Sequence, residues 1–154
     1  MAEVRIAILG AGSMGTVHAA AYAAMPEVSV VGVFSRDPAR AAAVAAICKA
    51  LPVTDAAAFI QRADIDAIDV CLPSANHHDV VVSALEAGKH VFCESPLALD
   101  LDQARRMRDA ARRMGRAGPA FRRRARDGLA ARRPGDGSCG DLSREQPCRL
   151  GDPY

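Results

Sequence analysis

The sequence predicts an α/β fold in which a parallel, doubly wound sheet carries helices on both of its faces. Two patterns predict it: short apolar segments alternate with helical segments, and a glycine-rich turn follows the first apolar segment. The 154 residues, 50% of them apolar and 25% charged, suffice for one good hydrophobic core. Parallel strands need crossover connections, and the helical segments supply them.

The N-terminal residues contain the first β-α-β unit. The apolar run 4–9 ends at Gly10 and predicts a buried parallel strand. We expect a helix over residues 13–25, because Pro26 cannot continue it. The apolar run 28–34 predicts the second strand.

Capping residues mark the next two helices. Asp37 precedes Pro38, which is favourable at the first helical position, so a helix is expected from there to about residue 51. Residues 53–54 predict a short strand. Asp55 then caps a short helix through residues 59 and 60.

Two more strands and two more helices follow. The run 65–72 predicts a strand, a helix is expected over 79–87 with Gly88 just past its end, and residues 90–93 predict the fifth strand. A last helix is indicated by an apolar stripe at helical spacing, with arginines on its other face: Leu101, Ala104, Met107, Ala111 and Met114.

The regular pattern stops near Gly115. We therefore expect residues 1–117 to form one domain and residues 118–154, rich in arginine, glycine and proline, to be a disordered tail. Arg, Gly, Ala, Pro and Asp are also what GC-rich codons give in a wrong reading frame. The composition thus favours a domain truncated or frameshifted after about residue 115.

A phosphate-binding motif opens the first helix. Residues 10–15 read Gly-Ala-Gly-Ser-Met-Gly and match G-x-G-x-x-G directly after a strand. Gly10 permits the tight turn, Gly12 removes a Cβ that would block a pyrophosphate, and Gly15 lets helix and strand pack closely. The helix N-terminus offers free N–H groups to phosphates. The motif predicts a Rossmann domain that holds a dinucleotide through Gly10, Gly12, Ser13, Met14 and Gly15; the alternative is a tight turn without a ligand.

The end of the second strand indicates which dinucleotide is bound. Domains that bind NAD usually place Asp or Glu about 20 residues after the glycines, on the ribose hydroxyls. Ser35 and Arg36 stand there instead, and a hydroxyl and a guanidinium favour a 2′-phosphate. Asp37 is interpreted as a helix cap. NADP is therefore favoured over NAD, unless Arg36 is only a solvated loop charge.

Three further stretches carry a family resemblance. They are Met-Gly-Thr-Val-His at 14–18, Leu-Pro-Ser-Ala-Asn-His at 72–77, and Ala-Gly-Lys-His-Val-Phe-Cys-Glu-Ser-Pro-Leu-Ala at 87–98. Together they make residues 4 to about 117 resemble the glucose–fructose oxidoreductase / inositol dehydrogenase (Gfo/Idh/MocA) family. This resemblance implies a nicotinamide-dependent oxidoreductase acting on a polyol or sugar hydroxyl. It also implies cofactor contacts on the ribose and nicotinamide side from Leu72, Pro73, Ser74, His77 and Glu94.

Two departures from the family bear on catalysis. The lysine that the family carries after this glutamate is Ser95 here, and serine has no charge at neutral pH. The family's second, sheet-based domain, with its acid–base histidine, has no counterpart in residues 118–154. No catalytic residue is therefore assigned, and we expect the isolated chain to bind cofactor but to be inactive. The alternative is a non-catalytic dinucleotide-binding module or redox sensor.

Composition argues against several other classes. A net charge of +2 favours neither nucleic-acid binding nor a membrane surface, and the arginine run 122–126 is interpreted as a charged tail. No apolar run is long enough to span a bilayer. Five cysteines without a CxxC pair indicate reduced thiols in a cytoplasmic protein. Four scattered histidines without paired acids predict no metal site, and His18 is interpreted as a packing residue. The oligomeric state stays open.

Overall fold

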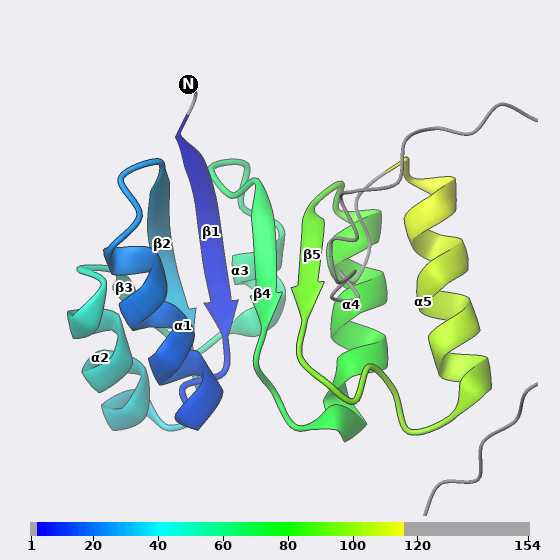
Figure 1. Cartoon of the computed structure of the whole chain (residues 1–154), viewed down its shortest axis with the longest axis horizontal. Coiled ribbons are helices and arrows are strands. Elements are labelled where there is room, and N and C mark those ends of the chain that lie inside the picture. Colours follow the sequence, from blue (N-terminus) through cyan, green and yellow to red (C-terminus); the bar gives the residue numbers. More distant parts are fainter. Residues whose placement is uncertain (1–2, 116–154) are drawn as a thin grey trace, which may run out of the picture. The chain divides into compact units, whose positions relative to one another are not determined.

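The computed structural model describes residues 3–115, which form alternating strands and helices (Figure 1). The tail predicted over 118–154 lies outside the described residues. The elements are β1 Val4–Leu9, α1 Ser13–Ala23, β2 Val28–Phe34, α2 Pro38–Ile47, β3 Leu51–Val53, α3 Ala56–Ile60, β4 Ala67–Val70, the 3-10 turn η1 Ser74–Asn76, α4 His77–Glu86, β5 His90–Cys93 and α5 Leu101–Arg113.

The five strands form one parallel sheet in the order β3-β2-β1-β4-β5. The central strand β1 pairs with β2 on one side and with β4 on the other, so the chain reverses its winding direction at β1. This order confirms the predicted Rossmann sheet. The carboxyl ends of β1, β2 and β4 lie side by side at one edge, where a doubly wound sheet binds its ligands (Figure 1).

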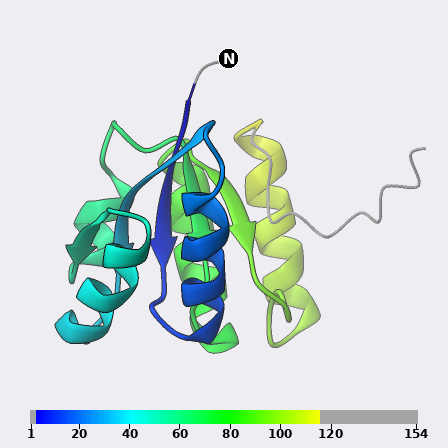
Figure 2. The same cartoon turned by 60° about the vertical axis from the view of Figure 1, so that its left-hand side comes forward.

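Helices cover both faces of the sheet (Figures 1 and 2). Helices α1 and α2 pack on one face, while α3 and α4 pack on the other and α5 lies against α4. Each face therefore has its own hydrophobic core: the first lies under α1 and α2, and the second under α3, α4 and α5. Side chains alternate along β1 accordingly, with Ile8 in the first core and Ala7 and Leu9 in the second. The first core also contains Ala19, Val30, Val33, Val44 and Ala45.

Several predicted boundaries differ from the structure. Helix α2 ends at Ile47 rather than near residue 51, because Lys49 adopts a left-handed φ of 56° and the chain then enters β3. Strand β4 is shorter than predicted, at Ala67–Val70. Helix α4 begins at His77 rather than at residue 79, directly after η1.

The apolar stripe of α5 is only partly buried. Met107 and Ala111 are in the core, as the spacing predicts. Leu101 and Met114, at the two ends of the stripe, are 73% and 40% exposed. Helix α5 therefore contributes the middle of its apolar face to the core through its packing on α4.

Candidate dinucleotide-binding site

A cavity of about 440 Å³ lies at the carboxyl edge of the sheet. Its walls come from the segments that follow β1, β2 and β4, together with the first turn of α2. Most of the residues predicted to bind a cofactor line it, namely Gly10, Gly12, Ser13, Met14, Ser35, Arg36, Leu72 and Pro73. Gly15, Ser74, His77 and Glu94 are not among its lining residues.

The three glycines of the turn have different environments. Gly10 has a φ of +124°, and a Cβ there would lie 2.5 Å from the carbonyl oxygen of Cys71. A Cβ on Gly15 would overlap the carbonyl oxygen of Gly10. A Cβ on Gly12 would meet no atom within 4 Å. Gly10 and Gly15 are thus required by packing, whereas the space beside Gly12 is free for a ligand.

The N-terminus of α1 faces the same region without a side-chain cap. Its capping residue is Gly12, and no side chain in the described part of the protein accepts from its first turn. Helices α2, α3 and α5 are instead capped by Asp37, Asp55 and Asp100. The N–H groups and the positive dipole end of α1 are therefore available to an anion.

Two arginines line the cavity beyond β2. Arg36 was predicted there, whereas Arg40, one turn into α2, was not singled out from the sequence. Asp37 caps α2 as predicted, because its Oδ1 accepts from the N–H of Ala39 at 2.9 Å. Its Oδ2 lies 3.4 Å from Nε of Arg40. The hydroxyl of Ser35 accepts from the N–H of Asp37 at 3.1 Å.

His77 is buried rather than presented to the cavity. Only 1% of the residue is exposed. Its Nε2 lies 2.6 Å from the carbonyl oxygen of Leu72, and its Nδ1 lies 3.1 Å from that of Pro96. The ring thus ties the segment after β4 to the segment after β5.

Glu94 follows β5 and reaches back across the sheet edge. Its Oε1 lies 3.0 Å from Nε2 of His18, and its Oε2 accepts from the N–H of Ser95 at 3.2 Å. The other ring nitrogen of His18 lies 2.8 Å from Oδ2 of Asp69. His18, interpreted from the sequence as a packing residue, therefore stands between two carboxylates.

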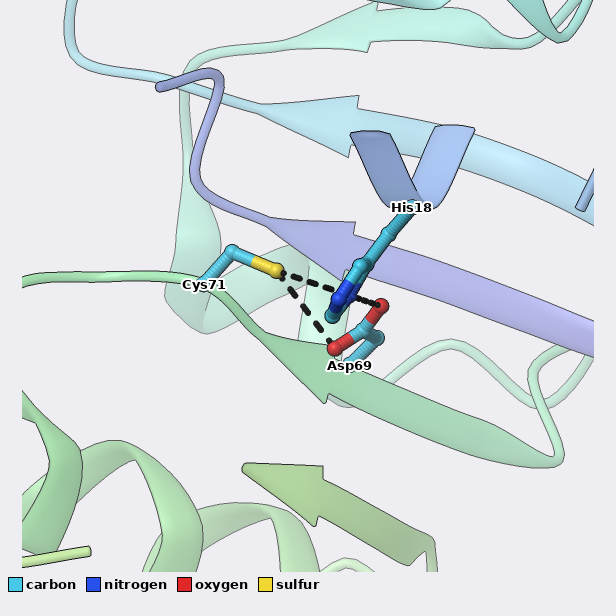
Figure 3. Close-up of side chains that lie close together, drawn as sticks. All are labelled: His18, Asp69 and Cys71. Carbon is cyan, nitrogen blue, oxygen red and sulfur yellow. Dashed lines mark hydrogen bonds and ion pairs between the residues drawn. The ribbon is translucent and has the colours of Figure 1, made fainter. Parts of the chain in front are cut away.

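Asp69 and Cys71 share one face of β4 and its extension, and α1 covers that face. Figure 3 shows the side chains of His18, Asp69 and Cys71 converging there. The Cys71 sulfur lies 3.3 Å from Nδ1 of His18 and 3.5 Å from Oδ1 of Asp69. Tyr22 donates its hydroxyl to Oδ2 of Asp69 at 3.0 Å. The sequence signal for this cluster was a carboxylate within an otherwise buried strand.

Burial sets the protonation chemistry of these groups. Burial raises the pKa of the Asp69 carboxyl, and the nearby His18 partly opposes that shift. Burial, followed by the charge of Asp69, raises the pKa of the Cys71 thiol far above its usual range. The same two causes raise the pKa of Cys93 to about 12. Cys71 and Cys93 are therefore protonated and weakly nucleophilic at neutral pH.

A parallel sheet that reverses at β1, with a glycine turn and a cavity at that point, defines the dinucleotide-binding class of Rossmann domains. The family model for the "Oxidoreductase family, NAD-binding Rossmann fold" matches residues 4–118. The chain belongs to this family, the Gfo/Idh/MocA oxidoreductases, as the sequence motifs predicted.

Curated relatives match the same region. The chain is 38% identical over 104 residues to inositol 2-dehydrogenase of Rhizobium meliloti, covering 66% of this chain and 31% of the relative. It is 36% identical over 115 residues to D-glucoside 3-dehydrogenase of Escherichia coli, covering 73% and 33%. The chain therefore spans about a third of the length of these relatives.

Solved structures share the fold. A 3-ketoreductase from Actinomadura kijaniata, crystallised with NADP, superposes with a TM-score of 0.70 at 34% identity, over 74% of this chain and 37% of that one. In the described part of the protein, no helix combines the length and the apolar character needed to cross a membrane.

Proposed function

We propose that the chain binds NAD(P) and is the cofactor-binding part of an oxidoreductase that acts on a polyol or sugar hydroxyl. The observation that carries the proposal is the open space beside Gly12 at the uncapped N-terminus of α1. A pyrophosphate there would accept hydrogen bonds from the first turn of the helix and interact favourably with its dipole. The residues present therefore fit the cofactor that the family binds.

Each part of the cofactor has residues suited to hold it. Gly10, Gly12, Ser13 and Met14 would hold the pyrophosphate, with Gly15 supporting the turn. Leu72, Pro73 and Ser74 would line the ribose and nicotinamide side, and Glu94 would close it. His77 would act indirectly, since its ring holds together the segments that carry these residues. The bound cofactor supplies hydride transfer, and this chain supplies binding and orientation.

NADP is the preferred cofactor in this proposal. Arg36 and Arg40 both line the cavity at the end of β2, where a 2′-phosphate would lie. The carboxylate of Asp37 is already engaged by the N-terminus of α2 and by Arg40. Two guanidinium groups and the Ser35 hydroxyl therefore favour a phosphate over a bare ribose hydroxyl.

Titration of the full chain with NADPH and with NADH, followed by nicotinamide fluorescence, tests this assignment. We expect NADPH to bind at least about tenfold more tightly, and Ser35→Asp to reverse the order by adding a carboxylate beside the 2′ position. Arg36→Ala should weaken NADPH binding and leave NADH binding unchanged. Arg106→Ala, on the exposed face of α5, is the matched control. A ratio of the two dissociation constants unaffected by both site variants would refute the assignment.

A second candidate function is a non-catalytic dinucleotide-binding module. Ser95, at the position of the family's lysine, carries no charge, and this observation favours the module. Turnover assays use inositol and a glucoside, compounds that the names of two relatives give, and turnover would exclude a non-catalytic module. We expect no oxidation by the 154-residue chain, and none after Ser95→Lys alone. Turnover by the unmodified chain would contradict this expectation.

A further inference from the structure

Three metal-binding atoms of different kinds converge beside the cofactor cavity. Nδ1 of His18, a carboxylate oxygen of Asp69 and Sγ of Cys71 all lie within 4.8 Å of one another. The segments that carry them are far apart in sequence, since 51 residues separate His18 from Asp69. Imidazole nitrogen, carboxylate oxygen and thiolate sulfur are the three ligand types that Zn²⁺ accepts in proteins.

The spacing of the three atoms is close to that of a zinc centre. Tetrahedral zinc with bonds of about 2.0 to 2.3 Å places neighbouring ligand atoms about 3.3 to 3.6 Å apart. Here Nδ1 of His18 lies 2.8 Å from Oδ2 of Asp69 and 3.3 Å from Sγ of Cys71, and that sulfur lies 3.5 Å from the other carboxylate oxygen, Oδ1. With a single Asp69 oxygen as ligand the three atoms stay within 4.8 Å of one another, so side-chain rotations would complete the geometry, and a water would take the fourth position.

The second nitrogen of His18 strengthens this interpretation. Nε2 lies 3.0 Å from Oε1 of Glu94, and in the tautomer that carries its N–H there the ring donates to this carboxylate. The lone pair of Nδ1 then faces Oδ2 of Asp69, and two acceptors at 2.8 Å need a proton or a cation near them. A carboxylate on the far nitrogen of a histidine is the usual outer partner of a metal-bound ring.

The surroundings of Asp69 also suit a cation. Asp69 is 1% exposed, and its hydrogen-bond partners in the described residues are His18, Tyr22 and Cys71, with no lysine or arginine among them. A buried carboxylate is costly unless it is paired or coordinates a metal. Helix α1 carries His18, strand β4 carries Asp69, and Cys71 follows β4 directly. Cys71 also borders the cofactor cavity.

We propose that His18, Asp69 and Cys71 form a Zn²⁺ site, with Glu94 orienting His18 as its outer partner. The three ligands are separate from the residues proposed to hold the pyrophosphate. The proposal revises the expectation, drawn from the scattered histidines, that the chain has no metal site. Binding replaces the thiol proton of Cys71 by the metal and releases that proton to solvent. The sulfur and nitrogen ligands select Zn²⁺ over Mg²⁺ and Ca²⁺.

Cobalt substitution gives a direct test in the full chain. Cys139→Ser and Cys148→Ser first remove two thiols that lie outside the described residues. In that background Co²⁺ should bind one to one and give a near-ultraviolet thiolate-to-cobalt charge-transfer band, which Zn²⁺ abolishes on displacing it. Cys71→Ser should eliminate the band. Cys48→Ser should leave it unchanged, because the Cys48 thiol faces backbone carbonyls of α2 instead.

Affinity measurements complete the test. Competition with a chromophoric chelator should show Zn²⁺ binding weakened at least about tenfold by Asp69→Asn, and about 10- to 100-fold by Glu94→Gln. Both changes keep the side-chain shape, and circular dichroism verifies the fold. A charge-transfer band that persists in Cys71→Ser, or one to one binding that never appears, would overturn the proposal. The second result would assign the cluster to hydrogen bonds among these side chains.

Discussion

The amino and carboxyl edges of the sheet contain similar polar residues, but these residues have different roles at the two edges. At the amino edge, Arg5 forms a bidentate pair with Asp66, with nitrogen–oxygen distances of 2.7 and 2.9 Å. Lys89 donates to the carbonyl oxygens of Arg62 and Ile65 at 2.6 and 2.9 Å. At the carboxyl edge, α1 lacks a side-chain cap and His18 stands between two acids.

This difference shows that residues at one edge of the sheet stabilise the fold, whereas residues at the other edge are suited to binding. The donors named at the amino edge meet acceptors within the protein, so they fix the strands without offering anything to a ligand. At the carboxyl edge, the first N–H groups of α1 are available to an anion, and the buried carboxylate of Asp69 is suited to a cation. Substitutions at the two edges should therefore produce different phenotypes.

The largest effect on folding is expected at the glycine that supports the turn. Gly15→Val would force side-chain atoms into the carbonyl oxygen of Gly10. We expect a loss of at least about 2 kcal/mol in the free energy of unfolding, measured in urea. Gly12→Val, whose Cβ meets open space, should change that free energy by less than about 1 kcal/mol. Equal destabilisation by both would contradict the distinction.

Lys89 should give the next largest effect, and it lies at the amino edge. Lys89→Met keeps the aliphatic stem but removes the donor to the buried carbonyl oxygen of Ile65 and to the half-buried one of Arg62. The expected cost is about 1 to 3 kcal/mol in the free energy of unfolding, with cofactor binding unchanged. Lys49, the chain's other lysine, is exposed, so Lys49→Met serves as the control and should be neutral. A loss of NADPH affinity in Lys89→Met would contradict the assignment of stability to the amino edge and of binding to the carboxyl edge.

The smallest effect concerns acid sensitivity at the same edge. Hydrogen bonds from the Arg5 side chain and its backbone N–H lower the pKa of Asp66 to about 2. A depressed pKa contributes stability that is present above the unfolded value near 3.9 and is lost as pH falls toward 2. Asp66→Asn should therefore flatten the fall in urea midpoint between pH 5 and pH 2.5. The effect is small because the pair is exposed. An unchanged acid limb would show that Arg5 does not hold Asp66 in solution.

The sequence predicted what depends on local patterning. Strands β1, β2 and β5 have the expected bounds, and Asp37 caps α2 as expected. These features follow from apolar runs, capping residues and a glycine motif, which act over a few residues. The end of α2 was wrong because it depends on the left-handed backbone of Lys49, a residue with no special preference for that conformation.

Other features depend on contacts between distant segments. His18 and Asp69 meet because α1 packs over β4, and neither residue type indicates such a pairing by itself. The burial of His77 likewise requires the segment after β5 to pass over α4 and offer its carbonyl oxygens. Arg40 reaches the cavity because α2 begins beside β2. A single sequence does not show which distant segments lie side by side, so these contacts could not be predicted from it.

The central claim is that the carboxyl edge is built to hold a dinucleotide at Gly12. The most direct test is to compare NADPH binding by the unmodified chain and by Gly12→Val, with urea unfolding measured on the same samples. The account predicts saturable binding by the unmodified chain and a loss of at least about 100-fold in Gly12→Val, with stability unchanged. Equal NADPH affinity in the two proteins, or no saturable binding by the unmodified chain, would contradict it.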